Sequence, residues 1–189
     1  MNINRIRETK KVSEQVVEFM NLFQEKGIVQ LPSELKLSEL YHWDLTNFIM
    51  YMIAADEQIN IDEVDIYRFL TGYGGDNLDS VKEYIEEGDV MSYDFQSTIP
   101  ESLKYLVRGV NTLLRFDDKS QMSLVLELYL QSFMMAGKEI MEADDRVSYV
   151  EKRDYDLYVN NMKAYIKEKS YISLDGSLAK LMTDISELL

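Results

Sequence analysis

The fold is decided by residues 48–63, which read FIMYMIAADEQINIDE. The first eight of these residues are apolar on every side of a helix, and such a helix is normally buried at the centre of a bundle. The polar letters that follow predict a short turn, and the pattern after them is that of an amphipathic helix ending near the glycines at 72–75. The stretch therefore predicts a buried helix, a turn and a second helix packed back against the first.

The same unit occurs again 88 residues further along the chain. Residues 143–151 read ADDRVSYVE and align with ADEQINIDE at residues 55–63, and Tyr67 aligns with Tyr155. The second copy also follows an apolar helix, predicted at 120–143, and opens an amphipathic one, predicted at 149–169. This repeated context predicts a duplicated helix–turn–helix unit.

The rest of the chain predicts further helices and no sheet. Only 2 prolines and 8 glycines occur in 189 residues, too few for many strands joined by tight turns. Residues 98–101, which read TIPE, have the form of a capping box that opens a helix. The other predicted helices span residues 6–26, 34–55, 78–87, 101–116 and 177–188. We therefore expect an all-α bundle of about eight helices with a pseudo-repeat.

Each repeated turn carries the residues of a helix cap. Asn60 with Glu63, and Ser148 with Glu151, have the spacing of capping boxes, in which each partner bonds the backbone N–H of the other. We expect Glu151 to be the more exposed half of its box. On this interpretation the acidic residues end one helix and start the next.

Divalent-cation binding is the alternative interpretation of the same residues, because Ca²⁺ and Mg²⁺ prefer oxygen ligands. The turn is not an EF-hand, since Ile61 stands where that loop needs glycine and Tyr67 where it needs a bidentate glutamate. A looser oxygen site stays open as an alternative to pure capping. Its candidate ligands are Asp56, Asp62, Glu63, Asp144, Asp145 and Glu151.

The repeated motif resembles that of the TerB-like tellurite-resistance family. The shared features are an apolar helix ending in Ala-Asp, a short turn with a β-branched residue, a small or polar cap, and a glutamate seven residues after the aspartate. The positions that match are Ala55, Asp56, Ile59, Asn60 and Glu63, and then Ala143, Asp144, Val147, Ser148 and Glu151. The chain departs from the family at Glu57 and Asp145, where glycine is usual.

The resemblance covers about residues 40–169 and implies a TerB-like helical domain at 38–170. A helical extension at 1–37 would precede it, and a C-terminal helix at 171–189 would pack on the same domain. The resemblance also implies a stress-response or envelope-associated module that binds metal ions or acts within protein complexes. It does not imply an enzyme.

Composition excludes several classes of function. The absence of cysteine excludes disulfides, thiolate nucleophiles and cysteine-bound zinc. His42 is the only histidine, and no nucleophile motif accompanies it, so we expect no catalytic site. The longest apolar run is well short of the roughly 20 residues of a membrane helix, so we expect a cytoplasmic protein without membrane insertion.

The net charge of −14 is concentrated in one part of the chain: residues 56–101 contain 13 acidic and 2 basic residues. Such a surface repels phosphates, so we expect no direct nucleic-acid binding and a protein partner with a basic surface. The candidate contact residues are Asp79, Glu83, Glu86, Glu87 and Asp89. An alternative is an acidic inhibitor, such as an immunity or anti-defence protein, that mimics nucleic acid and blocks a basic site. The sequence predicts no oligomeric state.

Overall fold

The computed structural model describes residues 2–32, 34–73, 77–88, 94–114, 119–143 and 147–172. Within these ranges the chain is all-α, as predicted, with no strand. The elements are α1 (Ile3–Glu25), α2 (Leu37–Ala54), α3 (Ile61–Thr71), α4 (Leu78–Glu87), the 3-10 helix η2 (Phe95–Ser97), α5 (Glu101–Leu113), α6 (Lys119–Met141) and α7 (Tyr149–Lys169). The helix predicted at 177–188 lies outside the described residues. No described helix is both long enough and apolar enough to cross a membrane.

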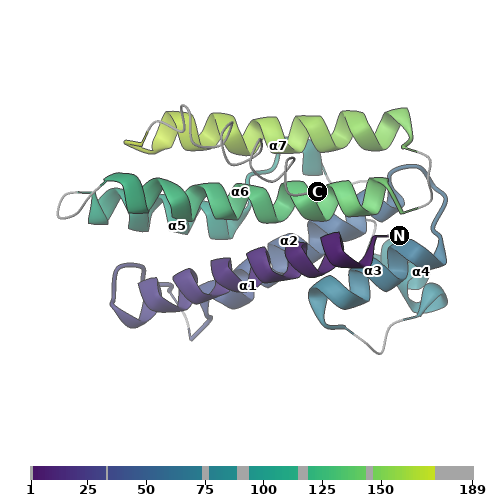
Figure 1. Ribbon diagram of the computed structural model, residues 1–189, viewed down its shortest axis with the longest axis horizontal. Helices are drawn as coiled ribbons and strands as arrows, with labels where there is room; N and C mark the ends of the chain where they lie inside the picture. The colour runs from purple at the N-terminus through teal and green to yellow at the C-terminus, as the bar shows by residue number, and fades with distance from the viewer. Residues whose placement is uncertain are drawn as a thin grey trace.

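The long helices run along the long axis of the molecule in three rows (Figure 1). In this view α7 lies at the top, α5 and α6 lie in the middle, and α1 and α2 lie below, with α3 and α4 at the right-hand end. The apolar helices α2 and α6 contact each other and most of the remaining helices, which explains why both are apolar on nearly every side. Helix α1 packs along α6, and its Val16, Met20 and Phe23 are buried in the same core.

Aromatic rings join the two halves of the repeat. The ring of Phe48 in α2 lies 5.4 Å from that of Phe133 in α6 and stacks at 4.8 Å on that of Tyr158 in α7. Gly137 in α6 makes this packing possible, because a Cβ there would lie 2.8 Å from Phe48 and 2.7 Å from Tyr155. The two repeats therefore pack closely at Gly137, where any larger residue would collide with Phe48 and Tyr155.

The capping box predicted at the start of α5 is wrong. Pro100 is the N-cap residue and makes no side-chain cap, and the Thr98 hydroxyl donates instead to the carbonyl of Asp94. The cap comes from α2, where the carboxylate of Asp44 accepts the N–H of Ser102 at 2.8 Å. Ser102 is fully buried, so the first turn of α5 takes its hydrogen-bond partner from the neighbouring helix. Burial raises the pKa of Asp44, and the hydrogen bonds to Ser102 oppose that rise.

Candidate functional site

Both repeated turns form the capping boxes that the sequence predicts. The N–H of Asn60 donates to Glu63 Oε2 at 2.9 Å, and the N–H of Glu63 donates to Asn60 Oδ1 at 3.0 Å. In the second copy, the N–H of Ser148 donates to Glu151 Oε2 at 2.8 Å, and the N–H of Glu151 donates to Ser148 Oγ at 3.1 Å. Asn60 and Ser148 therefore have the same role in the two turns, and so do Glu63 and Glu151. The two copies of the repeat share the same pattern of capping hydrogen bonds.

The exposure of the two glutamates differs from the sequence prediction. Glu63 and Glu151 are each 2% exposed, so the expectation that Glu151 is the more exposed half of its box is wrong. The reason is tertiary: α3 packs against α2, and α7 packs against α6. The third residue of each new helix therefore lies in the interface with the helix before the turn. A carboxylate buried in this way needs hydrogen bonds, and the cap supplies one of them.

The first turn contains a left-handed residue that is not glycine. Glu57 has a φ of 64°, and no other described residue except glycine has a positive φ. Asp56 supports this conformation, because its Oδ1 accepts the N–H of Gln58 at 2.9 Å. The family resemblance places glycine at position 57, where a left-handed backbone costs least. This chain adopts that backbone with a glutamate.

The candidate metal ligands do not share one centre in the described part of the chain. Asp56 and Asp62 are half-buried, whereas Glu63 and Glu151 are engaged in their separate caps. The residues that the structure describes include no group of three carboxylate or imidazole side chains placed to hold a metal ion. Asp144 and Asp145 lie outside the described ranges. The cation site stays a prediction from sequence.

The acidic residues of α4 gather on one side of that helix. Asp79, Glu83, Glu86 and Glu87 are exposed and follow the spacing i, i+4, i+7 and i+8, which is one helical face. The opposite side buries Val81 and Ile85 in the core. We call the four carboxylates the α4 acidic face. Asp89, the fifth predicted contact residue, lies outside the described ranges.

The α4 acidic face differs from the other charged helix surfaces in its ion pairing within the described ranges. None of the ion pairs in the described ranges includes any of its four carboxylates. Other helices of this chain do carry such pairs between neighbouring turns, including Glu8 with Lys11, Asp65 with Arg68, Glu101 with Lys104, and Lys152 with Asp156. The face therefore presents to solvent four carboxylates that form no ion pair with a described residue.

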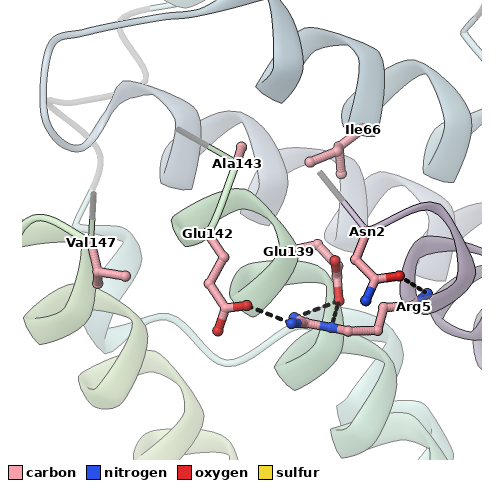
Figure 2. A pocket seen from close by; sticks show the side chains of 7 residues that line it. All are labelled: Asn2, Arg5, Ile66, Glu139, Glu142, Ala143 and Val147. Carbon is pink, nitrogen blue, oxygen red and sulfur yellow. Dashed lines mark hydrogen bonds and ion pairs between the residues drawn. The ribbon is translucent and has the colours of Figure 1, made fainter. Parts of the chain in front are cut away.

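A further charged group was not predicted from the sequence. Arg5 at the start of α1 reaches two carboxylates near the end of α6, Glu139 and Glu142, and forms ion pairs of 2.8 Å and 2.6 Å with them (Figure 2). Arg5 and Glu139 are 134 residues apart in the chain. No periodic or local signal links positions so distant, which explains why the sequence does not single them out.

Comparison with known proteins adds no evidence on function. No family model, no curated protein and no solved structure matches the chain, so the resemblance to TerB-like proteins stays a prediction from sequence.

Proposed function

We propose that the protein is a non-enzymatic, TerB-like interaction module of a stress response, which binds a partner protein with a basic surface through the α4 acidic face. The observation that carries this proposal is the set of four exposed carboxylates on α4 that have no ion-pair partner within the described ranges.

The arrangement costs stability in the free protein. Like charges at i, i+4 on a helix, such as Asp79 with Glu83 and Glu83 with Glu87, destabilise it by about 0.2–0.5 kcal/mol per pair. Helix α4 has only 10 residues, and isolated helices shorter than about 12–15 residues are marginal in water. Lysine or arginine side chains of a partner would relieve this repulsion on binding. Association driven in this way is fast at low salt and weakens steeply as salt rises.

The test compares two triple charge reversals. The first changes Glu83, Glu86 and Glu87 to Lys, and the matched control changes Glu14, Glu18 and Glu25 to Lys. The control residues are exposed carboxylates of α1 that form no ion pair with a described residue. Both variants alter the net charge equally, and circular dichroism checks that both remain folded.

The proposal predicts that the α4 variant loses partners captured from a cell lysate at low salt while the control variant keeps them. The wild-type complexes should dissociate as salt is raised. Equal loss in both variants would show that net charge alone attracts the partners. Retention by the α4 variant would exclude this face as the interface.

The second candidate is an acidic inhibitor that blocks a nucleic-acid-binding site. It is favoured by the concentration of 13 acidic residues within residues 56–101. Under this candidate the captured partner is a nucleic-acid-binding enzyme whose activity falls on addition of equimolar wild-type protein. Under the first candidate the partner retains its activity in the complex.

The cation site predicted from the repeats has a separate test. Binding of calcium to the native state would raise the melting temperature progressively with calcium concentration. The double variant Asp56→Asn, Glu63→Gln would remove that dependence. The slope against calcium is the readout, because Glu63→Gln also alters a helix cap. A flat response at millimolar calcium leaves capping as the role of these carboxylates.

A further inference from the structure

A cavity of about 370 Å³ lies where α1 and the first half of α2 meet the C-terminal end of α3. Ligand-binding pockets measure roughly 300–1,000 Å³ and are lined mainly by apolar groups, with a few polar groups among them. This cavity has both properties, because most of its lining surface is apolar and includes Val17 of α1 and Leu70 of α3. Every lining residue belongs to the described ranges, and none lies on α4.

His42, the only histidine of the chain, lines this cavity from α2. It is half-buried, and its ring lies 5.7 Å from that of Tyr41. Neither ring nitrogen has a hydrogen-bond partner among the described residues. Burial lowers the pKa of His42, so its imidazole is neutral at pH 7 and offers one donor and one acceptor nitrogen. Burying polar groups without such partners costs stability.

Ser13 supplies a further unused polar group. It is 5% exposed and lines the cavity from α1. Its Oγ accepts the hydroxyl of Tyr41 at 3.0 Å, but its own proton is donated to no described residue. Buried donors are normally satisfied by an acceptor. A ligand that fits this cavity therefore brings an acceptor to Ser13 and a hydrogen-bond partner to His42.

The charges around the cavity favour an uncharged ligand. Its ionisable lining residues from α1 are Lys10, Glu14 and Glu18, whereas the wall from α3, residues 70–72, has no ionisable side chain. Lys10 already donates to a carbonyl at the end of α3. The two exposed carboxylates and the net charge of −14 oppose a bound anion. The unused proton of Ser13 opposes a bound cation, because a cation offers it no acceptor.

We propose that this cavity binds a small uncharged molecule that carries a hydroxyl group on an apolar body, the chemistry of a phenol. The ligand hydroxyl donates to the acceptor nitrogen of His42, and its oxygen accepts the proton of Ser13. The apolar body lies against Val17 and Leu70. This site is separate from the α4 acidic face, and the proposal does not depend on that face.

The first experiment titrates the full chain with phenol and follows the imidazole C–H signals by proton NMR. Because the chain has one histidine, these signals belong to His42. Phenol should shift them saturably. Toluene, benzoate and benzylammonium should not, because toluene lacks the hydroxyl and the other two probes are charged. No saturable shift with phenol would overturn the site, and an equal shift with any of the other probes would overturn the assignment of the ligand.

The same signals give the pKa of His42 with and without phenol. A hydroxyl that donates to the imidazole favours its neutral form, so saturating phenol should lower the pKa of His42. This readout separates a hydrogen bond to the ring from mere proximity of an aromatic molecule. An unchanged or raised pKa would contradict the proposed contact.

Two variants test the polar groups by isothermal calorimetry with phenol. His42→Phe keeps a ring but loses both nitrogens, and Ser13→Ala loses the unused proton; each should weaken binding about threefold to tenfold. The matched controls Trp43→Phe and Ser38→Ala alter residues of α2 outside the cavity lining and should leave the affinity unchanged. Unchanged affinity in His42→Phe, or an equal loss in the controls, would refute the site. If Ser13→Ala does not fold, His42→Phe and the toluene comparison decide.

Discussion

Glu151→Ala tests whether the repeated glutamates serve as buried helix caps. The substitution removes the acceptor that lies 2.8 Å from the N–H of Ser148 and empties a site that is 2% exposed. A hydrogen bond to a charged group contributes about 1.5–3 kcal/mol, and an acid in the first turn of a helix adds about 0.3–1 kcal/mol through the helix dipole. Removing the charge also removes its desolvation cost. We therefore expect a net loss of about 2 kcal/mol.

Two companion variants set the scale for this loss. Ser148→Ala removes only the hydroxyl that accepts the N–H of Glu151 at 3.1 Å, and it should cost about 1 kcal/mol, the usual value for an N-cap. Glu151→Gln keeps an acceptor oxygen but loses the charge, so its free energy of unfolding should lie between that of the wild type and that of Glu151→Ala. The same order should hold for Asn60→Ala and Glu63→Ala in the first repeat.

Urea unfolding followed by circular dichroism measures these differences. For a chain of this size 1 kcal/mol corresponds to roughly 2–4 °C in melting temperature, so Glu151→Ala should melt about 4–8 °C below wild type. The double variant of Ser148 and Glu151 should lose less than the sum of the single losses, because the partners are in contact. A loss for Glu151→Ala no larger than that for Ser148→Ala would refute the buried-cap interpretation. So would strict additivity in the double variant.

Three further perturbations test the packing and the buried ionisable groups. Asp44→Ala should cost about 1–2 kcal/mol by removing the cap that α2 supplies to α5, and Asp44→Asn should cost less in the same urea assay because it retains an acceptor. Gly137→Ala should lower the melting temperature. Overpacking against Phe48 and Tyr155 costs about 1–3 kcal/mol, whereas the higher helix propensity of alanine gains about 1 kcal/mol. A higher melting temperature would contradict the close packing at this position. Burial raises the pKa of Tyr41 from its ordinary 10.0 to about 12, so the unfolded chain ionises first. The stability that the un-ionised Tyr41 contributes should be fully present below about pH 10 and should be lost as the pH rises towards 12, by up to about 1.4 kcal/mol per pH unit. Tyr41→Phe should therefore reduce the slope of the unfolding free energy against pH.

The sequence by itself determined the features of this protein that depend on neighbours within one or two helical turns. The apolar run at 48–55 predicts a buried helix, and α2 is buried at the centre of the bundle. Glu63 and Glu151 were predicted to bond their cap residues, and both do so. The short helix predicted at 78–87 is α4. These predictions succeed because capping and helical periodicity are local interactions over three to eight residues.

Only the tertiary structure decided which of these groups are buried and which distant groups meet. Glu151 is buried because α7 packs on α6, and no local pattern encodes that packing. The cap of α5 comes from Asp44, which is 58 residues from Ser102, whereas the local TIPE pattern predicted a cap that does not form. Arg5 meets Glu139 and Glu142 because α1 lies along α6. Such contacts depend on how the helices cross, which the side chains of the whole core determine together.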